Sequence, residues 1–238
     1  MVHFVNHVSK ALNNKEHAIA IFCDLRKAFD SCDHGILLRK LSGVGIRGDT
    51  VAWFKNYLSN RQQFVTISGY NSSLKLIKLG VPQGSILGPI LFLLYINDLP
   101  LSSLFYDFLF ADDTTLYASG PDLHELVAFV NLEFQKICLY FRQNKLALHP
   151  GKTQFILFSN SRDARDSDIS IFANNNNPGY NDPSLCTPLE RIQSSSNIPA
   201  VKFLGVYFDT ELSFKYHVKT ICTRVSRALY MLRTCKNS

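Results

Sequence analysis

Two apolar, strand-like runs in this chain end on aspartate side chains, and this pattern constrains the fold more than any other feature. Residues 18–24 predict a buried strand that finishes on Asp24, and an apolar hairpin over 104–118 carries Asp112 and Asp113 at its tip. A carboxylate beside a buried strand is costly to desolvate unless something neutralises it. If the two strands are neighbours, three carboxylates come together and repel one another unless divalent cations bind. A bare Asp-Asp turn, taken alone, is more often a solvated loop.

Helical and strand patterns alternate along the rest of the chain. Helices are predicted over 36–41, over 50–58 with Asp49 as the N-cap, over 85–97, over 122–141 and after Phe214. Further strands are predicted at 61–68, 74–80, 152–159 and 202–209. The segment 160–199 contains NNNN, several prolines and many serines, so we expect an exposed loop with one strand at Ile169–Phe172. These interspersed elements, with hairpins among them, indicate an α+β fold with an antiparallel sheet.

Composition narrows the class of protein. Hydrophobic residues make up 46% of the 238, which is enough for one substantial core. No apolar run reaches the roughly 18 residues of a membrane span, so no membrane partner is expected. The N-terminal residues lack the pattern of a signal peptide. None of the six cysteines forms a C-x-x-C pair, which is typical of a reduced, intracellular protein.

The excess of positive charge lies at one end of the chain. The net charge is +6, and the segment after Glu211 contains six cations and no acidic residue. A basic segment suits a polyanion such as nucleic acid, although a solvated helix face is the more general explanation of a charge strip.

Five sequence blocks occur in an order that resembles a known family. They are FCDLRKAFDSCDH, GVPQGSILGPILFLLYINDLP, FADDTTLY, NKLALHPGKTQFILFS and KFLGVYFD. Together they resemble blocks A to E of reverse transcriptases from retrotransposons that lack long terminal repeats, and the resemblance extends from about Ala18 to Asp209. It implies a right-hand polymerase palm over 1–211, with an antiparallel sheet flanked by helices, truncated fingers and a loop insertion at about 160–199. Residues 212–238 would begin a basic, helical thumb.

The resemblance also implies the chemistry of the site. Asp24 and Asp112 would bind two Mg²⁺ ions, with Asp113 in support. Phe29 matches the position at which a bulky ring excludes a 2′-hydroxyl, although plain core packing is the alternative. Gln83 would contact the incoming nucleotide, next to Gly84, which shapes the loop.

Further roles follow from blocks D and E and from the basic segment. Lys152 would neutralise the triphosphate or protonate the leaving pyrophosphate, unless it is an ordinary exposed lysine. The residues expected to support the primer and template are Phe203, Leu204, Gly205, Lys215 and Lys219. Asp30, Asp33 and Asp98 lie near helix starts or turns, where we expect them to act as caps.

The implied activity is RNA-directed DNA synthesis on an RNA template and a DNA primer from deoxynucleoside triphosphates, in the nucleus and cytoplasm. No protein partner can be read from the sequence.

Family members carry a long fingers region before block A, which here follows only 23 residues, and His149 stands where asparagine is usual. A truncated, inactive remnant and a non-enzymatic nucleic-acid-binding palm are therefore alternatives. A viral RNA-copying RNA polymerase is a weaker one. We expect weak or no primer extension from the isolated chain.

Overall fold

Strand β1 (His17–Cys23) lies in the middle of a five-stranded sheet with the order β13-β10-β1-β8-β7. Its neighbours are β8 (Asp113–Gly120) and β10 (Gln154–Phe158), and the outer strands are β7 (Tyr106–Phe110) and β13 (Glu190–Ile192). The structure is a computed structural model, and it describes residues 1–174, 186–196 and 198–236. Every neighbouring pair in this sheet is antiparallel except β10–β13, which is parallel.

The sheet separates two hydrophobic cores because alternate residues of a strand point to opposite faces. Along β1, Ile19 and Ile21 enter one core while Ala20 and Phe22 enter the other. Strands β8 and β10 divide their side chains in the same way. The central strand is therefore apolar on both faces, which explains why its sequence is a continuous apolar run rather than an alternating one.

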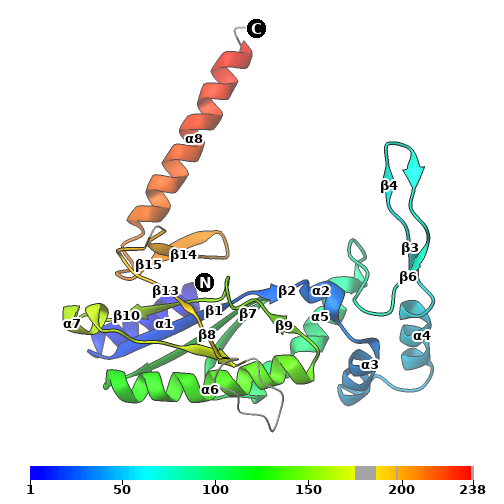
Figure 1. Cartoon of the computed structure of the whole chain (residues 1–238), viewed down its shortest axis with the longest axis horizontal. Helices are drawn as coiled ribbons and strands as arrows, with labels where there is room; N and C mark the ends of the chain where they lie inside the picture. Colours follow the sequence, from blue (N-terminus) through cyan, green and yellow to red (C-terminus); the bar gives the residue numbers. More distant parts are fainter. Residues whose placement is uncertain (175–185, 197, 237–238) are drawn as a thin grey trace.

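Helices cover the first core, and a helix with a hairpin covers the second. In chain order the helices are α1 (Val2–Asn13), α2 (Ala28–Ser31), α3 (His34–Gly43), α4 (Asp49–Leu58), α5 (Leu87–Ile96), the short 3₁₀ helix η1 (Leu99–Leu101), α6 (Leu123–Gln143), α7 (Arg162–Asp166) and α8 (Lys215–Lys236). In Figure 1, α6 crosses one face of the sheet, and α1 lies on the other face. In the described part of the chain, no helix has the length and apolar character needed to cross a membrane.

Helix α1 was not predicted from the sequence, although it anchors the second core. Phe4 is fully buried, and six aromatic rings, each from a different strand, lie within contact distance of its ring. Phe4, Val8 and Ala11 form the buried stripe of the helix at spacings of four and three residues. This spacing of apolar residues is visible in the sequence and could have predicted the helix.

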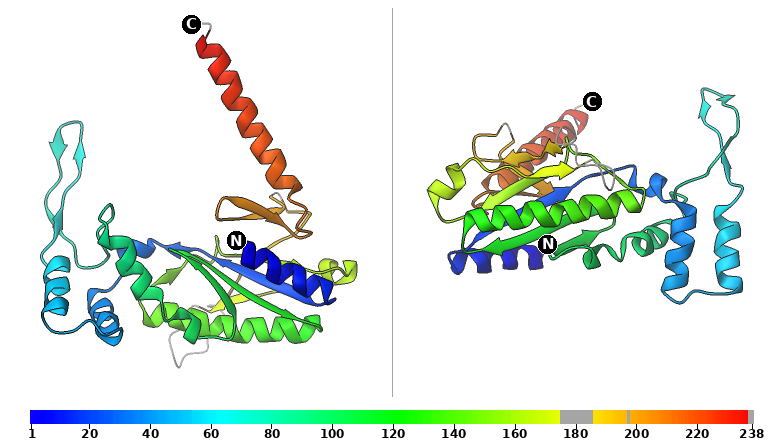
Figure 2. Two further views of the ribbon diagram at one scale, coloured as in Figure 1. Left: turned by 180° about the vertical axis from the view of Figure 1, so that it is seen from behind. Right: turned by 60° about the horizontal axis from the view of Figure 1, so that its bottom comes forward.

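Short two-stranded pairs complete the fold. They are β2 (Leu25–Arg26) with β9 (Ala147–Leu148), β3 (Gln62–Gln63) with β6 (Lys75–Leu76), β4 (Thr66–Ile67) with β5 (Tyr70–Asn71), β11 (Phe172–Asn174) with β12 (Cys186–Pro188), and β14 (Ala200–Phe203) with β15 (Val206–Asp209). Helix α4 and the hairpin made by β3 to β6, together residues 49–78, form what we call the arm. The hairpin of the arm and α8 project from the same side of the sheet, at separate ends of the molecule (Figures 1 and 2).

The structure confirms a mixed α+β fold but corrects several details. The sheet is mixed rather than antiparallel, because the chain after β10 crosses over through α7 and the β11–β12 pair before β13 returns alongside. The segment 160–199 is therefore not only an exposed loop with one strand, although its residues 175–185 and 197 lie outside the described residues. KFLGVYFD is not one strand but a hairpin. Asp49 is the first residue of α4 and makes no side-chain cap.

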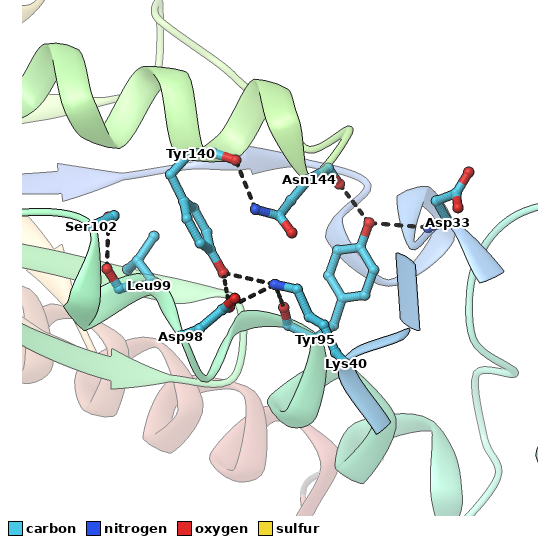
Figure 3. Close-up of polar contacts among 8 residues, drawn as sticks. All are labelled: Asp33, Lys40, Tyr95, Asp98, Leu99, Ser102, Tyr140 and Asn144. Atoms are coloured by element: carbon cyan, nitrogen blue, oxygen red, sulfur yellow. Dashed lines mark hydrogen bonds and ion pairs between the residues drawn. The ribbon is translucent and has the colours of Figure 1, made fainter. Parts of the chain in front are cut away.

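A polar network joins α3 to α5 and α6 on the helical side of the sheet (Figure 3). The Lys40 Nζ donates to the Asp98 carboxylate and to the Tyr95 carbonyl, both at 2.6 Å. The Tyr140 hydroxyl donates to the same Asp98 oxygen at 2.5 Å. Asp98 therefore pairs with a largely buried ammonium group, and the prediction that it caps a helix is wrong.

A second part of this network reaches the start of α3. The Tyr95 hydroxyl donates to the Asn144 carbonyl and accepts the Asp33 backbone N–H (Figure 3). Asp33 caps α3 as predicted, because its carboxylate accepts the Ile36 N–H at 2.9 Å. The other oxygen of Asp33 pairs with Lys145 at 2.7 Å. These contacts hold α3 against the turn that follows α6.

Truncating Phe4 tests the importance of the second core. Phe4→Ala removes a fully buried ring and should lower the free energy of unfolding by about 3–5 kcal/mol, measured by urea denaturation. Val2→Ala is the matched control, because Val2 is 73% exposed on the same helix, and it should change stability by less than about 0.5 kcal/mol. Equal effects of the two substitutions would contradict the packing assigned to α1.

Candidate active site at the end of strand β1

The backbone of Asp24 is held on both sides by the loop that follows β9. Its N–H donates to the Thr153 hydroxyl at 3.2 Å, and its carbonyl accepts the His149 N–H at 2.8 Å. The next two residues form β2 and pair with β9. Blocks A and D are therefore joined at the point where β1 ends, and Asp24 has little freedom to move.

Strand register places Asp113 beside Asp24. Cys23 pairs with Thr114 across the antiparallel β1–β8 ladder, so one further step brings Asp24 opposite Asp113. Directly opposed residues of an antiparallel pair share one face of the sheet. Because Cys23 belongs to the first core, the two carboxylates lie on the other face, on the side of the β14–β15 hairpin.

A cavity of about 120 Å³ lies where these two carboxylates come together. Asp24, Asp113, Lys152 and Lys202 all line it. Partial burial raises the pKa of the Asp113 carboxyl, the nearby charges of Asp112 and Asp24 raise it further, and the Lys202 ammonium opposes them. The net shift is upward, with burial as its largest cause.

The donor chemistry of this cavity suits Mg²⁺, which prefers carboxylate oxygens and completes its shell with water and substrate phosphates. Asp112 lies on the two-residue turn between β7 and β8, is exposed and does not line the cavity. Its neighbour Ala111 has a left-handed φ of 53°. Within the described ranges, no three Asp, Glu, His or Cys side chains form a metal-binding group. The three carboxylates expected at one point are thus arranged as a facing pair with a third beside it.

Blocks A and B are in contact through their backbones. The Gly80 N–H donates to the Cys32 carbonyl at 2.7 Å, and the Val81 N–H donates to the Phe29 carbonyl at 2.8 Å. A Cβ at Gly80 would lie 2.8 Å from the Asp30 Cα, and one at Gly88 would lie 2.4 Å from a backbone oxygen of block B. Only glycine permits this approach.

Phe29 and Gln83, the two side chains predicted to contact the nucleotide, lie where blocks A and B meet. Phe29 is half-buried and stacks on Phe92, with ring centroids 4.6 Å apart. Core packing therefore accounts for Phe29 in this structure. Gln83 is exposed, and its amide Nε2 donates to Asp30 at 2.7 Å. Asp30 is thus a hydrogen-bond partner of Gln83 and makes no cap. Gly84 has a φ of 80° and open space around it.

Block E forms the wall of the cavity opposite β1. Phe203 is buried in the second core and lines the cavity, while Leu204 and Gly205 make the β14–β15 turn with positive φ. Lys215 and Lys219 lie on the first turns of α8 and line a different pocket. The structure therefore brings Phe203 to the carboxylates and does not bring these two lysines there.

Sequence reasoning missed two ionisable side chains, Lys202 at this cavity and Asp107 on the opposite face of the sheet. Lys202 precedes Phe203 in β14, and strand alternation was the signal that it leaves the core. Asp107 lies on β7 opposite Leu116, which belongs to the first core. Burial raises the pKa of Asp107 to about 6, and its buried Oδ1 has no hydrogen-bond partner within the described structure. Only the position of Asp107 in an alternating strand could have indicated that its carboxyl is buried.

Comparison with known proteins places this arrangement in context. Residues 2–208 match the family described as "Reverse transcriptase (RNA-dependent DNA polymerase)". The RNA-directed DNA polymerase from mobile element jockey of Drosophila melanogaster is 26% identical over 240 residues, covering 96% of this chain and 24% of that protein. The probable RNA-directed DNA polymerase from transposon X-element of the same organism is 28% identical over 230 residues, 93% of this chain and 23% of that protein. The chain thus spans about a quarter of the length of these curated relatives.

The Asp107 carboxyl makes stability depend on pH. Its pKa in the fold, about 6, is above the value of roughly 3.9 for an unfolded aspartate. The stabilising proton is fully bound below pH 4 and is lost as the pH rises through 6. Relative to Asp107→Asn, the wild type should lose about 1–2 kcal/mol of unfolding free energy between pH 4 and 7, after allowance for partial exposure. Parallel urea titrations check this, and curves that keep a constant separation would contradict it.

Two glycine substitutions test the close approach between blocks A and B. Gly80→Ala adds a clash with Asp30 to the strain of a φ of 86°, whereas Gly84→Ala adds only the strain of a φ of 80°. Gly84→Ala should cost about 1 kcal/mol and Gly80→Ala at least about 2 kcal/mol more, by urea denaturation. Similar costs would show that the close approach is not essential.

Proposed function

Since the chain belongs to the reverse transcriptase family, we propose that it is the palm region of an RNA-directed DNA polymerase of the retrotransposon type. The observation that carries this proposal is the facing pair Asp24 and Asp113 at a cavity that Lys152 also lines. The β3–β6 hairpin with its flanking helices would belong to the fingers, and α8 would begin the thumb. The place of action would be the nucleus and cytoplasm.

The reaction would extend a DNA primer on an RNA template. The primer 3′-hydroxyl attacks the α-phosphate of a deoxynucleoside triphosphate, a new phosphodiester bond forms, and pyrophosphate leaves. Asp24, Asp112 and Asp113 would hold two Mg²⁺ ions, which activate the attacking hydroxyl and stabilise the leaving phosphate. The backbone hydrogen bonds of Asp24 with Thr153 and His149 support this role. They fix the position of the carboxylate, and rigid placement of charge is the main contribution of such a site.

Neighbouring side chains would bind and orient the substrates. Lys152 would donate a proton to pyrophosphate or balance the charge of the triphosphate. Lys202 lines the same cavity and would attract a primer or substrate phosphate. Gln83, oriented by Asp30, would contact the incoming nucleotide. Phe29 would exclude a 2′-hydroxyl, supported by its rigid stacking on Phe92.

The β14–β15 hairpin and α8 would hold the primer–template duplex. Phe203 anchors the hairpin in the second core, so the turn at Leu204 and Gly205 has a firm base for contact with the primer backbone. Lys215 and Lys219 would contact phosphates from α8. This helix is basic, and most of its side chains between residues 215 and 235 are exposed. A non-enzymatic nucleic-acid-binding palm is the second candidate, favoured by the same basic helix.

Single carboxylate substitutions separate the two candidates. In Mg²⁺-dependent primer extension on an RNA template, Asp24→Asn and Asp113→Asn should each lower incorporation by about 100-fold or more, because each removes a charge placed at the reacting phosphate. Asp112→Asn, at an exposed turn, should have a smaller effect. Asp122→Asn is the control, since asparagine can keep the α6 cap.

Because weak or no extension is expected from this chain alone, metal binding supplies a second measurement. Isothermal titration with Mn²⁺ should show binding to the wild type and Asp122→Asn, and much weaker binding to Asp24→Asn and Asp113→Asn. Equal incorporation and equal Mn²⁺ affinity across all variants would rule out a catalytic site here.

A further inference from the structure

The two outer edges of the five-stranded sheet differ in how well they are protected from pairing with a further strand. The edge at β13 is three residues long and carries Glu190 and Arg191. Short length and charged side chains are common devices that keep an edge from pairing. The edge at β7 is longer, has the sequence YDFLF and contains neither lysine nor proline. It therefore lacks most of the protection that the β13 edge has.

The backbone of β7 has polar groups that point away from the sheet. The β7–β8 ladder ends with Phe110 opposite Asp113 across a two-residue turn. Residues that flank such a turn hydrogen-bond to each other, and in an antiparallel ladder every second residue faces the neighbouring strand. Asp107 and Leu109 therefore turn their N–H and C=O groups toward the free edge. In the described part of the chain, no hydrogen bond outside this ladder involves the backbone of residues 106–110.

The side chains of this edge are mainly apolar and partly exposed. Tyr106 is 61% exposed, Phe110 is 63% exposed, and none of the five residues is buried. Tyr106, Phe108 and Phe110 share one face of the sheet because they alternate along the strand. Phe108 packs on the second core, with its ring centroid 5.5 Å from that of Phe4. The edge thus presents a row of three aromatic rings that is anchored at its centre.

The segment that leads into β7 is almost free of charge. From Leu79 to Tyr106 the sequence has one charged residue, Asp98, and that carboxylate pairs with Lys40. Leu101 and Leu104, just before the strand, are 88% and 73% exposed. Nucleic acid binding needs cations to contact phosphates, and this segment offers none. An exposed, uncharged apolar surface is typical of contact with another protein.

A second copy of this chain fits the edge about a two-fold axis. With the axis at Phe108, antiparallel pairing places Phe108 opposite Phe108 of the second copy, and Tyr106 opposite Phe110 of the second copy. Aromatic pairs across strands stabilise such a ladder. Asp107 then faces an apolar residue, Leu109 of the second copy, whereas an axis at Asp107 would oppose two carboxylates. We infer that two copies of this chain associate through β7, in the register centred on Phe108, and form one continuous sheet.

The size of this contact predicts a weak, reversible dimer. A standard protein interface buries roughly 800 Å² per partner. A completely buried aromatic side chain contributes roughly 150–250 Å², so two half-exposed rings on a five-residue edge give less than the standard area. The dissociation constant should therefore lie in the micromolar range.

Association through β7 does not depend on the proposed function. In an antiparallel pair of β7 strands, the turns that carry Asp112 lie at opposite ends of the joined ladder. The edge also leaves out Asp24 and Asp113, which lie at the other side of the hairpin, between β1 and β8. Asp113→Asn should therefore associate like the wild type, so loss of association and loss of primer extension are independent results.

Sedimentation velocity of the nuclease-treated full chain tests the association at high salt, over about 1–100 μM, the range that suits a small interface. The wild type should pass from monomer to dimer with concentration. Tyr106→Lys should weaken association at least about tenfold, because a charge on an edge opposes pairing, and Tyr106→Phe should retain it. Leu232→Lys is the control, since Leu232 is a 67% exposed apolar side chain on α8. Urea denaturation checks that each variant is folded.

Cysteine cross-linking tests the register and does not rely on a charged substitution. The exposed Cys222 and Cys235 are first replaced by serine. Directly opposed Cβ atoms lie about 4.5–5.5 Å apart, close enough for a disulfide after a small adjustment. A mixture of Tyr106→Cys and Phe110→Cys chains, oxidised with diamide, should give a covalent dimer on a non-reducing gel. Either variant alone should give little, because neither position faces its own copy.

Four outcomes would overturn the inference. They are a monomer over the whole concentration range, a dimer that Leu232→Lys dissociates and Tyr106→Lys does not, equal cross-linking of the mixture and of the single variants, and association that high salt or nuclease abolishes. The second outcome would place self-association on α8. The last would show that nucleic acid bridges the copies, because backbone pairing between apolar edges is insensitive to salt.

Discussion

The register between β1 and β8 is the constraint on which the rest of the structure depends. Because Cys23 pairs with Thr114, Asp24 just after β1 and Asp113 at the start of β8 are carboxylates on the same face. A slip of one residue would reverse every side chain of β1 between the two cores. The buried residues on both faces, with Phe4 on one side and α6 on the other, therefore fix the geometry of the site as well as the stability of the sheet.

The molecule combines a tightly held centre with exposed basic extensions. Around Asp24, hydrogen bonds from His149 and to Thr153, and the backbone contacts between blocks A and B, leave little room for adjustment. The arm and α8 extend from this centre and expose their cations to solvent. Carboxylates and lysines meet at the cavity, whereas the projecting parts are mainly basic. A long polyanion would thus contact the extensions, and only its reacting end would approach the carboxylates.

The sequence predicted the elements with strong periodicity or apolar runs, and the blocks predicted which of them adjoin. Strand β1, the β7–β8 hairpin and α6 were found close to their expected positions. The parallel β10–β13 pair could not be predicted, because β13 has only three residues and depends on a crossover of the chain. Whether Asp112 or Asp113 faces Asp24 depends on the register between β1 and β8. That register cannot be read from the sequence. Gln83 and Asp30 are 53 residues apart, so their contact has no local signal.

The close approach at Gly80 and Gly88 has an evolutionary consequence. Each glycine lies against backbone atoms, and every amino acid has the same backbone. No substitution elsewhere can therefore create space for a side chain, so a change at either position cannot be compensated by a second one nearby. Most core positions can change in compensating pairs, because a larger side chain can be matched by a smaller neighbour. Gly80 and Gly88 have backbone as their nearest contact, so they restrict the sequences compatible with this fold more tightly than the buried side chains do.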